Sequence, residues 1–216
     1  VSFMKIHKAF RLRIYPTLLQ IERMDRWNNA LRFLWNLALE QRIIGLSRSR
    51  DERVFPTDYD QMKELTELRA ELPWLKDVPR HVSAQLLIEL ERAWQRCFAR
   101  ISRTPKFKRK NGDYLSFTES DPKTWRLDGN AIRFPKLGNL RAVIHRPVQG
   151  KPKICTIKRE GNQGFASIMC EIEIADPVPR TEPVVALDRG VVNIVADSDG
   201  NIIESPRYYA RAMKRL

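Results

Sequence analysis

The chain has 216 residues, of which 43% are hydrophobic and 30% are charged, a composition typical of folded rather than disordered proteins. Lysine and arginine total 39 against 26 acidic residues, which gives a formal net charge of +13. That excess argues against a plain small-molecule enzyme and favours a polyanionic partner, most often nucleic acid. No apolar run approaches the roughly 18 residues of a membrane span, and the N-terminus has no apolar signal-peptide region. We therefore expect no membrane partner and a cytoplasmic location.

A strand is predicted near the N-terminus, over Lys8–Tyr15. Apolar and basic side chains alternate there, which is the period-two pattern of a strand with one polar face. Pro16 is expected to end it. The apolar positions are Phe10, Leu12 and Ile14.

Three helices are predicted to follow. The first has its N-cap at Thr17 and extends to Gly45. The second begins after Thr57, with Asp60 three residues on in the capping-box position, and the third begins at Ser83. Their apolar residues repeat at helical spacing, so we expect them to form a core rather than a ligand site.

After residue 104 the pattern changes to short β-like segments between Gly, Pro and Asn-Gly signals. Five strands at such intervals favour a small barrel or sandwich, which the first strand could join, so that the helices would be an insertion. Three prolines in 176–183 predict a linker. The predicted strands are Tyr114–Thr118, Ala131–Phe134, Leu140–His145, Lys153–Arg159 and Ala166–Ile174.

Beyond this linker, three strands and the start of a helix are predicted. A continuous apolar strand, Val184–Leu187, ends at Asp188, and the Asp-Gly pair at 199–200 signals a hairpin between Val191–Ala196 and Asn201–Glu204. Such a piece would leave an apolar sheet face uncovered. That indicates a domain that is cut short or that a partner completes.

The positive charge concentrates in the middle of the chain. Residues 1–100 carry a net charge of +5, residues 101–160 carry +10 and residues 161–216 carry −2, which sum to +13. A localised block favours a nucleic-acid-binding face over a solubilising surface, because cations neutralise phosphates and strand aromatics can stack on unpaired bases. The candidate binding residues are Lys106, Lys108, Arg109, Lys110, Tyr114, Arg133, Lys136, Arg141, Arg146, Lys158 and Arg159.

Asp188 is the candidate catalytic and metal-binding residue. A carboxylate at the end of an apolar strand is costly unless it is paired or binds a cation. The order strand–Asp–strand–hairpin–strand also fits a ribonuclease H type of fold, in which clustered carboxylates hold two hard cations. A turn or capping role is the alternative.

The three cysteines are predicted to be small buried hydrophobic residues in a reducing compartment. No two of them have the CxxC spacing of zinc ligands, so we predict no zinc site. They are Cys97, Cys155 and Cys170.

Several segments resemble, in order and spacing, the TnpB proteins, which are RNA-guided nucleases encoded by certain bacterial insertion sequences. The resemblance extends from about residue 5 to the end of the chain. The segments are KAFRLRIYPTLLQ at 8–20, PKFKRK at 105–110, IRFPKLGNLR at 132–141, GKPKICTIKRE at 150–160 with the FASIMCEIE that follows, and VVALDRGVVNIVADSDG at 184–200.

This resemblance implies an α+β protein. A wedge β-barrel of the oligonucleotide-binding type would occupy 1–16 and 104–178, a helical recognition domain would be inserted at 17–103, and 183–216 would begin a RuvC nuclease domain of ribonuclease H fold. Asp188 would be the first catalytic, metal-binding aspartate of that domain. The later catalytic Glu and Asp and the zinc-binding insert of the family would lie beyond residue 216. The expected cofactor, Mg²⁺ or Mn²⁺, would belong to the complete nuclease only.

The leading hypothesis is the N-terminal part of a TnpB-like RNA-guided DNA endonuclease associated with transposition. Guide RNA would bind the basic face of the barrel and target DNA would be the second partner, with a homodimer as one option. Because one carboxylate cannot hold a metal pair, we expect no cleavage by this chain alone. The alternatives are a nuclease-less RNA-guided DNA-binding repressor, an unrelated structural RNA-binding protein and a conventional DNA transposase.

Overall fold

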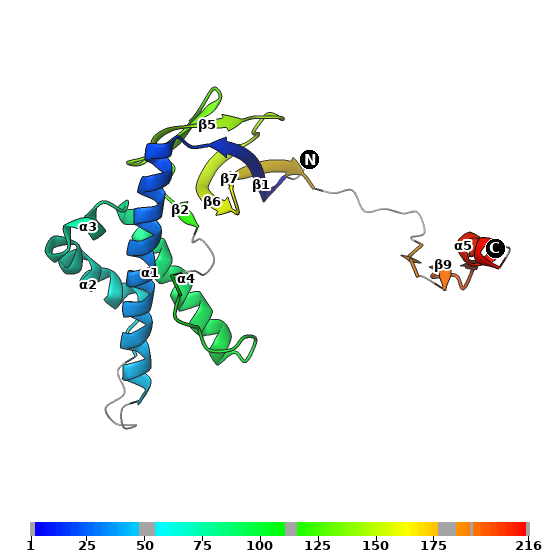
Figure 1. The fold of residues 1–216 in the computed structure, drawn as a ribbon, viewed down its shortest axis with the longest axis horizontal. Helices are drawn as coiled ribbons and strands as arrows, with labels where there is room; N and C mark the ends of the chain where they lie inside the picture. Colours follow the sequence, from blue (N-terminus) through cyan, green and yellow to red (C-terminus); the bar gives the residue numbers. More distant parts are fainter. Residues whose placement is uncertain (1–2, 48–54, 111–115, 177–184, 191, 215–216) are drawn as a thin grey trace. The chain divides into compact units, whose positions relative to one another are not determined.

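The protein is described from a computed structural model that covers residues 3–47, 55–110, 116–176, 185–190 and 192–214. The chain divides into a larger unit, Ser2–Ile174, and a smaller unit, Ala175–Leu216, and each is described by itself (Figure 1). Among the helices in these ranges, none combines the length and the apolarity that a membrane crossing requires.

A seven-stranded antiparallel sheet forms the base of the larger unit, and its strands follow the order β2-β6-β7-β1-β5-β4-β3. Its strands curve visibly (Figure 1). The first strand in sequence lies at the centre, between two strands from the other end of the unit. The strands are β1 (Phe3–Tyr15), β2 (Phe117–Glu119), β3 (Arg126–Asp128), β4 (Ala131–Phe134), β5 (Gly138–Val143), β6 (Lys151–Glu160) and β7 (Gln163–Ala175).

Four helices come between β1 and β2 in sequence. They are α1 (Leu18–Ser47), α2 (Asp58–Glu71), α3 (Pro73–Lys76) and α4 (Arg80–Phe98). The long helix α1 packs on α3 and α4, and α4 also packs on β2 of the sheet (Figure 1). The fold class is therefore a mixture of helices with an antiparallel sheet, as the sequence predicts.

The predicted strand pattern is confirmed at β1, where Phe10, Leu12 and Ile14 are each at most 2% exposed. The strand begins at Phe3, five residues before the predicted start. The prediction covered only the part in which apolar and basic residues alternate clearly. Strand β3 was not predicted, because it has only three residues and two of them are charged.

Capping interactions explain where two helices begin. The backbone N–H of Thr17 donates to Gln20 Oε1 at 2.9 Å, and the N–H of Gln20 donates back to Thr17 Oγ1 at 3.4 Å. The predicted capping box of α2 is confirmed, since Thr57 and Asp60 exchange the equivalent pair of hydrogen bonds. The Thr57 hydroxyl also donates to Asp60 Oδ2 at 2.7 Å, and this bond, followed by the one from the Thr57 N–H, lowers the pKa of the Asp60 carboxyl.

The predicted start of the third helix at Ser83 is wrong. The helix α4 begins at Arg80, with Pro79 at its N-cap, and Ser83 is buried within it. The Ser83 hydroxyl donates to the carbonyl of Pro79 at 3.4 Å, so the residue that resembles a cap makes its bond inside the first turn. The segment between Pro73 and Pro79 contains the short helix α3.

A buried arginine connects three helices. Arg42 on α1 is fully buried and donates to Gln61 Oε1 on α2 at 3.0 Å and to Glu91 Oε2 on α4 at 2.6 Å. Gln61 in turn donates to the carbonyl of Ala38 at 2.8 Å. A buried charge is tolerated only when it is paired in this way, so the network fixes how these helices pack.

The smaller unit has three antiparallel strands in the order β10-β9-β8 and one helix, α5 (Tyr208–Met213). The strands are shorter than predicted, and the hairpin turn at Asp199 and Gly200 is confirmed, with a φ of 87° at Gly200. None of the described residues 185–214 is buried, so apolar side chains such as Leu187 stay exposed, as expected. The predicted linker lies outside the described residues from 177 on. The strands are β8 (Leu187–Asp188), β9 (Asn193–Asp197) and β10 (Ile202–Glu204).

Candidate nucleic-acid interface

One face of the seven-stranded sheet carries cations and aromatic rings. Along each strand, core residues alternate with residues that point to the opposite face. The register places Tyr15 beside Arg141 and Arg133 beside Arg126, on that opposite face. We call this surface the outer sheet face, and its residues are Arg11, Arg13, Tyr15, Arg126, Arg133, Arg141, Lys158 and Phe165.

Arginines lie close to aromatic rings on the outer sheet face. The Arg11 guanidinium carbon is 3.9 Å from the ring centre of Phe165, and that of Arg13 is 5.1 Å from the same ring. Glu160 borders this face and pairs with Arg11 at 2.7 Å and with Lys158 at 3.6 Å. Positive charge beside aromatic surface is the combination that binds phosphates and stacks on bases.

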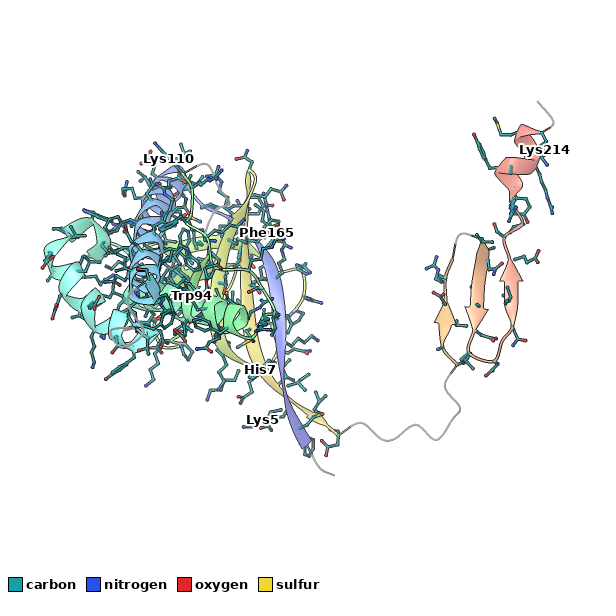
Figure 2. All side chains as sticks on the ribbon, turned by 90° about the horizontal axis from the view of Figure 1, so that it is seen from below. Lys5, His7, Trp94, Lys110, Phe165 and Lys214 are labelled. Carbon is teal, nitrogen blue, oxygen red and sulfur yellow. The ribbon has the colours of Figure 1, made fainter. Side chains whose placement is uncertain are left out.

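A second set of cations lies on the basic segment, residues 105–110, which α1 holds in place. Trp35 Nε1 donates to the carbonyl of Lys106 at 3.0 Å. Asn36 Nδ2 donates to the carbonyl of Lys108 at 3.1 Å, and Asn36 Oδ1 accepts from the N–H of Lys108 at 2.7 Å. These bonds involve the backbone of the segment, so its four cationic side chains remain exposed, and Figure 2 shows Lys110 beside the helices and Phe165 on the sheet.

The structure does not bring all candidate residues onto these two surfaces. Lys136 is in the turn between β4 and β5, where its Nζ donates to the carbonyl of Lys76 at 2.6 Å. Burial, and next the nearby Arg69, lower the pKa of Lys136. Arg159 follows Lys158 on β6 and therefore points to the other face, toward Asp25 at 3.6 Å.

Two further candidate binding residues, Arg146 and Tyr114, are not among the residues that define these two surfaces. Arg146 is exposed after β5, with its guanidinium carbon 5.5 Å from the ring of Phe10. Tyr114 lies outside the described residues.

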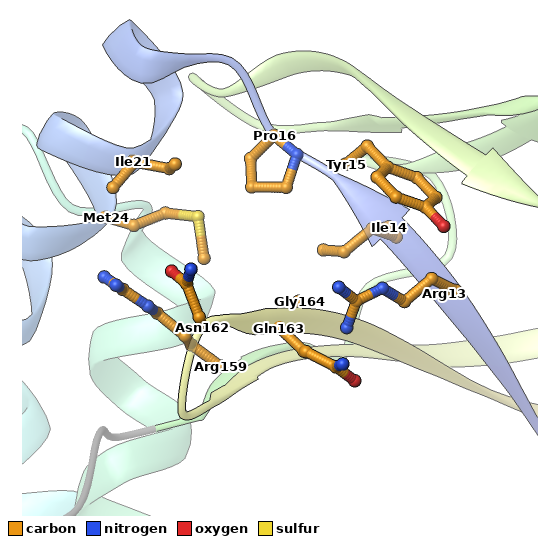
Figure 3. A pocket seen from close by; sticks show the side chains of 10 residues that line it. All are labelled: Arg13, Ile14, Tyr15, Pro16, Ile21, Met24, Arg159, Asn162, Gln163 and Gly164. Carbon is orange, nitrogen blue, oxygen red and sulfur yellow. The ribbon is translucent and has the colours of Figure 1, made fainter.

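A cavity of about 150 Å³ lies between the end of β1, α1 and the turn that joins β6 to β7 (Figure 3). Ile21 and Met24 of α1 form one wall, and Arg13 comes from β1 (Figure 3). The Nη1 of Arg13 is buried and has no hydrogen-bond partner among the described residues. A buried donor without a partner costs about 1–3 kcal/mol. Gly164 lets the strands approach, because a Cβ there would be 2.9 Å from Ile14 Cγ1.

Sequence reasoning missed several of these residues. The alternation over Lys8–Tyr15 places Arg11 and Arg13 on the polar face of a strand, but it does not show that Phe165 lies beside them. The alternation of arginines with apolar residues was the available signal. The contact of Trp35 and Asn36 with the basic segment joins residues far apart in the sequence, and nothing local indicates it.

Asp188 ends strand β8, is exposed, and lies opposite Ala196 in the register. Within the ranges that the structure covers, no three His, Cys, Asp or Glu side chains are grouped so that they could hold a metal ion. Asp197 on the neighbouring strand accepts the side-chain N–H of Asn201 at 2.7 Å, which lowers its pKa and assigns it to the turn. These residues do not by themselves fit a two-metal site, and metal binding by Asp188 stays a prediction.

The prediction of small buried hydrophobic residues is confirmed for Cys155 and Cys170, whereas Cys97 is only half-buried. All three are free thiols, and Cys155 and Cys170 are buried in the sheet. Burial raises the pKa of the Cys155 thiol far above its ordinary value, so it stays protonated.

Two known proteins are similar to nearly the whole chain. The chain is 31% identical over 216 residues to "Putative RNA-guided DNA endonuclease InsQ" of Escherichia coli (strain K12), a match that covers 99% of this chain and 52% of that protein. It is 30% identical over 220 residues to "Putative RNA-guided DNA endonuclease" of Streptomyces pristinaespiralis, covering 98% of this chain and 53% of that protein. The resemblance to the TnpB family is confirmed. This TnpB-like chain spans about half the length of the relatives it matches.

A family model described as a helix-turn-helix domain, HTH_OrfB_IS605, matches residues 4–47. In this structure those residues form β1 and the single uninterrupted helix α1, not two helices joined by a turn. Among solved structures, a chain of the Cas12f1-sgRNA-target DNA complex aligns with 97% of this chain and 59% of its own, at 11% identity and a TM-score of 0.37. That score is too low to support an argument.

Proposed function

We propose that this chain is the nucleic-acid-binding part of a TnpB-like RNA-guided DNA endonuclease that acts in association with transposition. The observation that carries this proposal is the match of nearly the whole chain to a protein named as an RNA-guided DNA endonuclease. The sheet would be the wedge barrel of 1–16 and 104–178, and the helices would be the recognition insert of 17–103. The smaller unit would begin the RuvC domain near residue 183.

The guide RNA would bind the outer sheet face and the basic segment. Both surfaces present exposed arginine or lysine, and the first adds aromatic rings from β1 and β7. Neutralising phosphates releases counterions, which makes such binding strong and dependent on salt. Target DNA would pair with the guide, so most of the sequence would be read by base pairing and not by protein side chains.

In the complete protein, Asp188 would supply one ligand to a Mg²⁺ or Mn²⁺ site. The remaining ligands would have to come from residues other than those that the structure describes, since these bring together no metal-binding group. Bound metal ions would supply the activation of water for phosphodiester cleavage.

A salt titration of RNA binding tests the proposal. Charge reversal to Glu at the four cations of the basic segment, Lys106, Lys108, Arg109 and Lys110, should weaken binding to an RNA hairpin with a single-stranded tail. Each lost phosphate contact should also flatten the slope of log affinity against log salt by about 0.7–0.9. The slope is measured by fluorescence anisotropy between low and physiological salt.

The matched control reverses four exposed cations of the smaller unit, Arg189, Arg207, Arg211 and Lys214, and so changes the net charge equally. It should leave most of the affinity and the slope intact. Equal losses in both variants would mean that total charge alone drives binding. An unchanged affinity and slope in the first variant would remove the basic segment from the interface.

A further inference from the structure

Two large aromatic side chains are exposed together on the helices of the larger unit. Phe33 on α1 and Trp74 on α3 are 41% and 48% exposed. Their ring centres are 5.1 Å apart with an angle of 77° between the planes, an edge-to-face pair. Aromatic rings are usually buried, and an exposed group of them marks a binding surface.

This pair lines a groove between α1 and α3 with a volume of about 520 Å³. We call it the α1–α3 groove, and it is lined by Arg23, Arg26, Asn29, Phe33, Trp74 and Asp77. Its acidic residue is already paired, since Asp77 accepts from Trp27 Nε1 at 3.0 Å and lies 3.3 Å from Arg23 Nη2. Arg23 Nη1 also donates to the carbonyl of Lys136 at 2.6 Å, so this side of the groove is held by the sheet as well as by the helices.

The charge around the groove is positive. Arg26 lies on its wall and is exposed, and no hydrogen bond or ion pair of its side chain is found among the described residues. Lys76 and Lys136 lie beside it, joined by the hydrogen bond from Lys136 Nζ to the carbonyl of Lys76. Burial is the main cause that lowers the pKa of Lys136, and Arg69, Arg23 and Lys76 add to this effect while Asp77 opposes it. The groove therefore combines unneutralised cations with an accessible indole ring.

We propose that the α1–α3 groove binds an unpaired segment of a nucleic-acid strand, with one base stacked on Trp74 and an adjacent phosphate contacting Arg26. Stacking on an aromatic ring is tolerant of sequence and needs an unpaired base, whereas a duplex hides its base faces. An acidic peptide would use the cations but would gain little from the indole. The inference rests on the proposed function only in requiring that the chain binds nucleic acid.

The test distinguishes stacking of a base from contacts with the phosphates. Binding of the whole chain is measured with two labelled single strands of equal length, one of them abasic at every position. The substitution Trp74→Ala should weaken binding of the base-bearing strand about tenfold and leave binding of the abasic strand unchanged, while Trp74→Tyr should restore most of the loss. Arg26→Gln should weaken both strands similarly. Because both side chains are exposed, these variants should remain folded.

The matched control is the pair Tyr209→Ala and Arg211→Gln in the smaller unit, where both residues are exposed, and it should change neither affinity. Equal effects of Trp74→Ala on the two strands, or none, would overturn the groove as a stacking site. Displacement of the strand by polyglutamate only in the presence of Trp74 would also overturn it, in favour of a peptide site. If basic-segment variants lose RNA binding while the Trp74 variants do not, the proposed function survives and the groove fails.

Discussion

At the scale of single residues, Glu119 is a carboxylate that is buried in the sheet. It lies on β2, is 1% exposed, and accepts the backbone N–H of Asp121 at 3.3 Å. His81 Nδ1 on α4 is 3.5 Å from the same carboxylate oxygen. Burial raises the pKa of Glu119, and the hydrogen bond from Asp121 and the nearby His81 only partly oppose that effect.

This shift predicts a pH-dependent difference in stability between the wild type and Glu119→Gln. Because the folded state holds the Glu119 proton more tightly than the unfolded chain does, wild-type stability should fall relative to the variant as the pH rises above about 4.5, the ordinary carboxyl value. The difference should become constant above the raised pKa. Free energies of unfolding from urea titrations at several pH values measure it, and a difference that does not vary with pH would contradict it.

Glu171→Gln is a control with the opposite sign. The bond from Lys153 is the main cause that lowers the pKa of Glu171. The stability that Glu171 contributes should therefore be present above the ordinary carboxyl value and be lost as the pH falls through its lowered pKa. The two variants should diverge from wild type in different pH ranges.

At the scale of elements, the contact of α1 with the basic segment is the feature that gives four cations a fixed position. The substitution Asn36→Ala removes two hydrogen bonds to the backbone of Lys108 and should release the segment without removing any charge. We expect faster amide hydrogen exchange at 106–110 and a severalfold weaker affinity for structured RNA, because an ordered segment loses less entropy on binding. The slope of affinity against salt should stay close to wild type.

Asn29→Ala, which removes an exposed asparagine elsewhere on α1, is the control for hydrogen exchange only, because Asn29 lines the α1–α3 groove, and it should leave exchange at 106–110 unchanged. Unaltered exchange in Asn36→Ala as well would show that Trp35 alone holds the segment. If the slope of affinity against salt flattened as much as in the charge-reversal variant, the segment would have lost its phosphate contacts, and a loss of order alone would not explain the weaker binding.

The elements also show what the sequence could predict. Alternation gave β1 and the centre of β6 and β7, and the Thr57–Asp60 pair gave the start of α2, because these signals lie within a few residues. The start of α4 was wrongly predicted at Ser83, because a buried serine and a capping serine cannot be distinguished by their residue type. The outer sheet face could be predicted only as a charge excess, since the strand order that brings Phe165 beside Arg11 is a long-range property.

At the scale of the whole molecule, the chain has a proposed binding surface, and the residues that the structure describes bring together no group of metal ligands. We therefore expect no cleavage when the 216-residue chain is incubated with guide RNA, matching DNA and magnesium, although it should bind both nucleic acids. Retention in a gel and the absence of cut DNA are measured together. Cut DNA that disappears in Asp188→Ala would show that this chain holds a complete metal site after all.

The position of β1 at the centre of the sheet has a consequence for synthesis. A ribosome makes this strand before anything else in the larger unit, yet its two neighbours, β5 and β7, emerge only after every helix of that unit has been completed. Until then the apolar side of β1 has no sheet to join, and pairing with distant residues is a slow step. The nascent chain must therefore carry an unpaired, arginine-bearing segment until β5 and β7 have been made, and the sheet of the larger unit can be completed only after its helices.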